Sequence, residues 1–205
     1  MSKHKSGRNT LLMSVLMSAP GPLVVGMGLM TGRSSTQIAD FVRRSAELLA
    51  IIAAFAVYQL TNQKESFDQE KKQRLERIAN VFVGAMMCLG GSIMFLLAFM
   101  SDNEDKGNVI PGLTIAVLGV IANGLFWKKY TRLHRQEPNA ILKVQAVLYR
   151  AKTLVDGCVT LALFSVAMLP GSEISFWLDR IGSAIVAFYL AWSGIRTIRI
   201  RPEKQ

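Results

Sequence analysis

Charged residues at helical spacing stand inside an apolar stretch in the first third of the chain. The segment IADFVRRSAELLAIIAAF, residues 38–55, carries four of them: Asp40, Arg43, Arg44 and Glu47. Positions i, i+3 or i+4 and i+7 lie on one face of a helix, so these side chains form a single stripe. Its carboxylates are the kind of group that binds a cation or carries a proton, and its guanidinium groups are the kind that neutralises a carboxylate.

A second stripe lies in a later apolar stretch, where Lys152 and Asp156 are four residues apart and share a helix face. Glu47 lies about eleven residues from the outer end of its segment, and Asp156 lies about thirteen residues from the outer end of its own. The two carboxylates are therefore expected at a similar depth in the membrane. Charged side chains at such depth cost roughly 2.5–3.5 kcal/mol each and normally face other helices along a pathway. The two stripes are therefore predicted to face each other.

The elements that would position these stripes are long apolar blocks. The chain has 205 residues, of which 51% are hydrophobic and 19% charged. Each block is about long enough to cross a bilayer of roughly 30 Å as a helix. The blocks are residues 10–31, 36–60, 76–100, 109–128, 139–169 and 175–197.

This pattern predicts an all-α membrane protein, a bundle of six transmembrane helices. The transmembrane domain is predicted at 10–198, between tails at 1–9 and 199–205, with no C-terminal soluble domain. The first block contains Pro20 and Pro22 and lacks a clean cleavage site, which indicates a retained helix kinked at the prolines rather than a signal peptide.

The basic residues sort to one side of the predicted membrane. The N-terminal tail, the loops at residues 62–77 and 128–138 and the C-terminal residues 196–205 hold 16 of the 24 Lys and Arg residues, whereas the alternate loops hold three. By the positive-inside rule both termini are cytoplasmic, and the location we expect is a bacterial inner membrane. The net charge of +10 then reflects topology and anionic lipid rather than nucleic acid. The predicted partners are the lipid bilayer and a second copy of the chain.

Three segments resemble the transmembrane domain of the cation diffusion facilitators, which exchange divalent metal for protons. The junction between that family's first and second helices is similar to the segment VVGMGLMTGRSSTQIADFVRRSAELLA. Its fourth helix is similar to VLGVIANGLFWKKYTRLHRQEPNAIL, which has an internal asparagine, Asn123. Its last helix is similar to FWLDRIGSAIVAFYLAWSGIRTIR. The resemblance covers about Val24 to Arg199 and implies a six-helix antiporter fold with divalent cations such as zinc as substrate.

The family's metal site is a quartet with the pattern D/H-x-x-x-D on the second and the fifth helix. In this sequence the second member of each pair is acidic, Glu47 and Asp156, but the first members are Arg43 and Lys152. Arginine does not ligate metals, and lysine does so only when deprotonated. Two carboxylates alone make a poor tetrahedral zinc site, which also calls for nitrogen or sulfur ligands.

Three hypotheses follow for function. In the first, the protein is a membrane cation transporter, by metal/proton exchange, and the carboxylates that act as ligands or proton carriers are Asp40, Glu47 and Asp156. In the second, the protein is a non-transporting relative whose charges form internal ion pairs, such as Arg43 with Asp156 and Lys152 with Glu47. In the third, the fixed positive charges change the substrate, for example to an anion.

Other polar residues have two interpretations. Asn80 and Asn123 either line the path or hydrogen-bond between helices, and Arg44 belongs to the charged stripe. We find no nucleophile–base arrangement, phosphate-binding loop or dinucleotide fingerprint, so the sequence does not indicate an enzyme. No resident cofactor is expected, and a transported divalent metal would be substrate.

Overall fold

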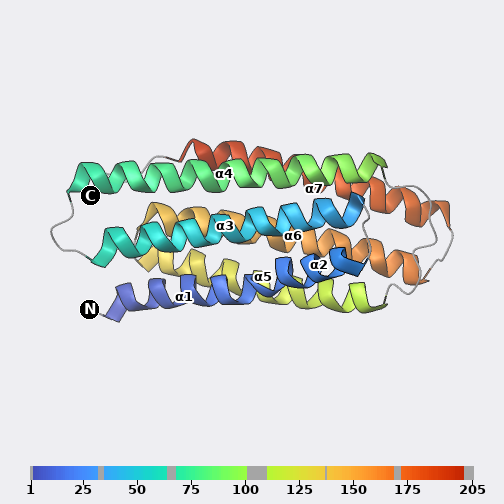
Figure 1. The fold of residues 1–205 in the computed structure, drawn as a ribbon, viewed down its shortest axis with the longest axis horizontal. Helices are drawn as coiled ribbons and strands as arrows, with labels where there is room; N and C mark the ends of the chain where they lie inside the picture. The colour runs from blue at the N-terminus through green and yellow to red at the C-terminus, as the bar shows by residue number, and fades with distance from the viewer. Residues whose placement is uncertain are drawn as a thin grey trace.

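The chain is helical throughout the residues that the structure describes. This computed structural model describes residues 2–31, 35–63, 68–100, 110–136, 138–168 and 172–200, and no strand forms within these ranges. The helices in chain order are α1 (Ser2–Ser18), α2 (Pro20–Thr31), α3 (Ser35–Gln63), α4 (Gln69–Met100), α5 (Ile110–Gln136), α6 (Ala140–Met168) and α7 (Glu173–Ile198). The predicted all-α bundle is confirmed (Figure 1).

The first predicted span is divided at its prolines. Helix α1 ends at Ser18 and α2 begins at Pro20, after a single turn residue, Ala19, whose backbone N donates to Val15 O at 2.9 Å. Proline suits the start of a helix because its φ is already helical and its missing N–H would have no partner there. The predicted kink is therefore confirmed, and it falls between Ser18 and Gly21, close to the charged cluster described below.

Helix α1 begins well before the apolar block that predicted it. Residues 1–9 were expected to form a cytoplasmic tail, and the helix already starts within it, at Ser2. A Cβ atom added at Gly7 would overlap the hydroxyl group of Tyr58, so this polar part of α1 packs tightly on α3. Packing against a neighbouring helix supports helical structure beyond the apolar stretch, since tertiary contacts supply most helix stability.

Helices α4 and α7 pack along each other through glycine residues. A Cβ atom added at Gly84 would lie 2.7 Å from Gly194 O, and one added at Gly194 would lie 2.7 Å from Gly84 O. Two turns further along this contact, a Cβ atom at Gly91 would lie 2.8 Å from Ala187 O. Small residues of this kind let two helix backbones approach closely.

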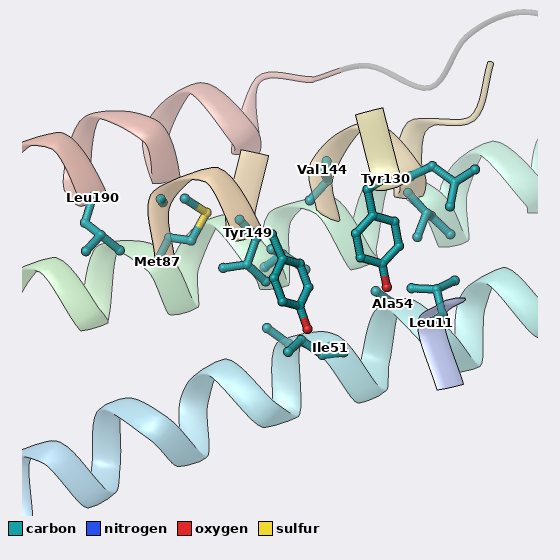
Figure 2. Packing of buried hydrophobic residues seen from close by; sticks show 14 of the residues in the cluster. Leu11, Ile51, Ala54, Met87, Tyr130, Val144, Tyr149 and Leu190 are labelled. Carbon is teal, nitrogen blue, oxygen red and sulfur yellow. The ribbon is translucent and has the colours of Figure 1, made fainter. Parts of the chain in front are cut away.

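Aromatic rings from α5 and α6 occupy the core beneath the charged residues. The ring of Tyr149 lies 5.1 Å from that of Phe126 and 5.4 Å from that of Tyr130, measured between centroids. The Tyr130 hydroxyl is hydrogen-bonded to Ser14 Oγ at 2.8 Å and donates to Thr10 O at 3.3 Å, which ties α1 to the core. Figure 2 shows both tyrosines among the buried side chains of this cluster.

Two helical stretches in the described residues are long and apolar enough to cross a membrane by length and composition alone. They are Gln69–Leu96 in α4 and Arg180–Ile198 in α7. Helices α3 and α6, by contrast, carry charged residues within otherwise apolar sequence. The remaining predicted spans therefore rest on the sequence pattern.

Candidate functional site

Charged side chains from α3 and α6 meet inside the bundle. Lys152 Nζ lies 3.3 Å from Glu47 Oε2, and Arg43 Nη1 donates to Glu47 Oε1 at 3.4 Å. The side chains of these three residues are only 14–15% exposed. Each carboxylate oxygen of Glu47 thus has a base beside it, and the predicted facing of the two stripes is observed.

Asp156 on α6 accepts a hydrogen bond from a side chain of α5. Asn123 Nδ2 donates to Asp156 Oδ2 at 2.6 Å. One turn earlier on α5, a Cβ atom added at Gly119 would lie 2.6 Å from the same oxygen. Glycine at this position therefore leaves room for the carboxylate to reach α5. Asn123 thus bonds across helices, and it also borders the cavity described below.

Helix α6 is fixed at its start and along the stripe that carries Lys152. Asn139 Oδ1 accepts from the backbone N of Ile141 at 2.9 Å and of Leu142 at 3.3 Å, which caps the helix. The Lys152 ammonium lies 5.2 Å from the centroid of the Tyr149 ring, within range of a cation–π contact. These contacts hold the ammonium beside Glu47.

A cavity of about 520 Å³ lies among these side chains. Its lining comes from the α1–α2 kink and from α3, α4, α5 and α6. Arg44 extends toward the kink, since a Cβ atom added at Gly21 would lie 3.6 Å from its Nη1. The described charged residues of the lining are three bases and two acids, namely Arg43, Arg44, Lys152, Glu47 and Asp156.

Two predicted site residues are not brought to this cavity by the described structure. The backbone of Asp40 belongs to α3, but its side chain lies outside the described residues. Asn80 is buried on α4, does not border the cavity, and neither polar atom of its side chain has a hydrogen-bond partner among the described residues. The site therefore consists of the five charged residues named above together with Asn123.

Two residues that contact the site, Tyr149 and Gly119, were not predicted from the sequence. Tyr149 supports Lys152 and shares a hydrogen bond with Ser18 at 3.4 Å between the hydroxyl oxygens. Its position three residues before Lys152 places it on the same helix face, a signal that the sequence contains. Gly119 lies four residues before Asn123 in the same way, but its role depends on the fit between α5 and α6, which spacing alone does not show.

The donor set of the site is made of oxygen atoms. Glu47 and Asp156 supply carboxylate oxygens and Asn123 supplies an amide, whereas Arg43 cannot act as a metal ligand. Within the described residues, no group of three or more His, Cys, Asp or Glu side chains gathers in a way that would hold a metal ion. The arrangement does not offer the nitrogen and sulfur ligands that zinc prefers, and its described lining holds one more base than acid.

Comparison with known protein families identifies the family of this chain. The model of the cation efflux transmembrane domain matches residues 11–200. The chain belongs to the cation efflux family. Members of this family are transporters rather than enzymes and are embedded in the lipid bilayer, so this protein is an integral membrane protein of a cation transporter family.

The family match agrees with the resemblance seen in the sequence. It confirms the resemblance to the cation diffusion facilitators and extends from the middle of α1 to the end of α7. A comparison with curated proteins found no matching sequence. The cation efflux assignment therefore rests on the family model, and the details of this site rest on its own geometry.

Proposed function

We propose that this cation efflux protein exchanges a divalent metal cation for protons across the membrane, with Glu47 and Asp156 as the carboxylates that bind the cation. The observation that carries this proposal is that the two carboxylates, from α3 and α6, border one cavity of about 520 Å³. Charged groups inside a membrane domain are costly and mark ion or proton pathways. Asp40, one turn before Arg43 on the same helix, is proposed as a further ligand or proton carrier.

Cation binding on this proposal competes with an internal cation. The Lys152 ammonium lies 3.3 Å from Glu47 Oε2, where an entering metal ion would bind. The metal ion must therefore displace Lys152 from this oxygen or bind on the Asp156 side of the cavity. Because the ammonium is tethered to α6, the strength of the Lys152–Glu47 pair sets how readily the site accepts a second positive charge.

The two ion pairs on Glu47 also favour a second candidate function. With one base beside each carboxylate oxygen, the site is neutralised from within, as in a relative that does not transport but stabilises an assembly. A substrate other than a cation is the further variant, since the described lining has one more base than acid. Both variants predict that no divalent cation crosses the membrane through this protein.

Transport in reconstituted vesicles separates these functions. The purified protein in proteoliposomes with an internal pH dye should take up a divalent cation while protons leave, and Glu47→Gln and Asp156→Asn should each abolish this exchange. Ser92→Ala, at an exposed position of α4 away from the cavity, is the control that should transport normally. If no divalent cation moves in the native protein, the non-transporting function is favoured, and movement of phosphate or chloride instead indicates the altered substrate.

We also propose that both termini are cytoplasmic, that the membrane is a bacterial inner membrane, and that the protein is a homodimer. The split of the basic residues between the two sides supports the orientation. In a variant without Cys88 and Cys158, a cysteine at Asn103 should react with an impermeant reagent in intact cells, and one at Gln69 should not. The reverse pattern would contradict the orientation.

A further inference from the structure

One face of α6 is exposed along much of the helix and changes from basic to apolar. From Ala140 to Arg150, the only exposed residues are Lys143 and Arg150. Further along, Leu154 is 43% exposed and Leu161 is 63% exposed. Steps of seven, four and seven residues place these four side chains on one face of the helix, which we call the open face of α6.

The bases of the open face have no acid beside them. The Arg150 guanidinium lies 6.0 Å from the ring centroid of Trp127 on α5 and 5.9 Å from that of Tyr189 on α7. Among the residues that the structure describes, neither Lys143 nor Arg150 forms an ion pair. An exposed arginine in a membrane domain is costly without an anionic acceptor for its five N–H donors.

Helix α7 brings a third base to the same end of the open face. Arg196 is exposed and lies seven residues after Tyr189, so both are on one face of α7. Because α7 runs back along α6 (Figure 1), Arg196 lies toward the same end of the bundle as Lys143. The two are each seven residues from the Arg150–Tyr189 contact, which places them at about the same height.

The neighbouring helix shows where this group lies in the membrane. Trp127 is followed directly by Lys128 and Lys129, both exposed, and tryptophan next to lysine is typical of the level of the lipid headgroups. Arg150 contacts Trp127 and therefore lies near that level, whereas Leu154 and Leu161 lie deeper. Gly157 lies between these two leucines, and an added Cβ atom there would meet nothing within 4 Å among the described residues.

We propose that the open face of α6 binds an anionic phospholipid. Its phosphate group contacts Arg150, Lys143 and Arg196, and an acyl chain lies along Leu154 and Leu161. Basic pockets between transmembrane helices bind anionic headgroups in this way. With the orientation proposed above, the lipid belongs to the cytoplasmic leaflet.

This lipid site is separate from the charged cavity. Lys152 and Asp156 each follow a residue of the open face by two positions, which turns them about 200° around α6. The lipid site therefore stands whether or not a cation is exchanged, and its test does not use transport.

The test is lipid binding to the purified full chain in a neutral detergent, measured by native mass spectrometry with phosphatidylglycerol and phosphatidylcholine. We expect the native protein to prefer phosphatidylglycerol, and Lys143→Gln/Arg150→Gln to weaken its binding by at least about tenfold. Lys129→Gln/Arg132→Gln is the matched control, since it removes the same two charges from exposed positions of α5 that are turned away from Trp127. Its affinity for phosphatidylglycerol should stay within about twofold of the native value.

Three results would overturn the inference. They are equal affinity for the two lipids, equal losses in the two double variants, and displacement of the lipid by soluble glycerol phosphate, which would indicate a site for a free phosphate compound. If Lys143→Gln/Arg150→Gln does not fold, Trp177→Phe/Trp192→Phe leaves Trp127 as the one tryptophan and decides instead. Bromine-labelled phosphatidylglycerol should quench its fluorescence more than labelled phosphatidylcholine does, and equal quenching would contradict the site.

Discussion

The contact between α4 and α7 differs in kind from the contact between α3 and α6. Along α4 and α7, glycine residues such as Gly84 and Gly194 bring two backbones to the shortest approach that sterics allow. Between α3 and α6, long charged side chains meet across a cavity of about 520 Å³. The first contact is fixed by shape, whereas the second depends on the balance of charge and has space for an ion. This difference indicates that α4 and α7 form the scaffold and that α3 and α6 form the site.

The largest effect on stability is expected where a charge is removed from the α3–α6 contact. Lys152→Met leaves the Glu47 carboxylate without one of its bases, and breaking a buried ion pair costs about 3–5 kcal/mol. We expect the free energy of unfolding of the detergent-solubilised protein to fall by up to that amount. Arg43→Ala should act in the same direction.

The double variant Lys152→Met/Glu47→Gln provides the control for this prediction. Removing both charges should restore part of the lost stability, because no carboxylate at position 47 is then left short of a base, although Arg43 loses the carboxylate that it contacts at 3.4 Å. Equal losses in the single and the double variant would show that packing, rather than charge balance, holds α3 against α6.

A smaller but specific effect is expected in the α4–α7 contact. Gly84→Ala places a methyl group 2.6 Å from the Ile198 side chain and 2.7 Å from Gly194 O, and overpacking of this kind costs about 1–3 kcal/mol. Gly157→Ala on α6 is the matched substitution, because an added Cβ atom there has nothing within 4 Å among the described residues. It should be neutral or stabilise the helix by about 0.5–1 kcal/mol. Similar thermal stability of the two variants would argue against a rigid α4–α7 scaffold.

The smallest effect is expected at the hydrogen bond that ties α1 to the core, outside both contacts. Tyr130→Phe removes the hydroxyl that lies 2.8 Å from Ser14 Oγ, and a hydrogen bond of this type contributes about 0.5–1.5 kcal/mol. Unfolding of this variant should show a loss in that range with unchanged cation binding. A change in cation affinity would mean that the position of α1 controls the site directly.

The sequence predicted the elements of this fold better than the details of its site. Apolar blocks and prolines located the helices and the kink, because hydrocarbon length and proline geometry act locally. The contact of Lys152 with Glu47 was also predictable, since both lie at a similar depth on facing stripes. The hypothesis paired Arg43 with Asp156, and the ion pair that the structure shows for Arg43 is with Glu47, one turn away on the same helix.

What the sequence could not show depends on the fit between helices. The bond from Asn123 to Asp156 requires α5 and α6 to pack at one particular register, which Gly119 permits. The cavity likewise results from residues of six helices, α1 to α6. Local patterns contain neither the register nor the space left between helices.

Zinc calorimetry on the native protein and on Arg43→His/Lys152→Asp tests the central claim most directly. The claim is that tethered bases occupy the family's metal positions and that the native site does not strip zinc to protein ligands. The double substitution offers four ligand side chains in the family's pattern, so its zinc affinity should exceed that of the native protein by at least about a hundredfold. Tight zinc binding by the native protein that is lost in Glu47→Gln or Asp156→Asn would contradict the account.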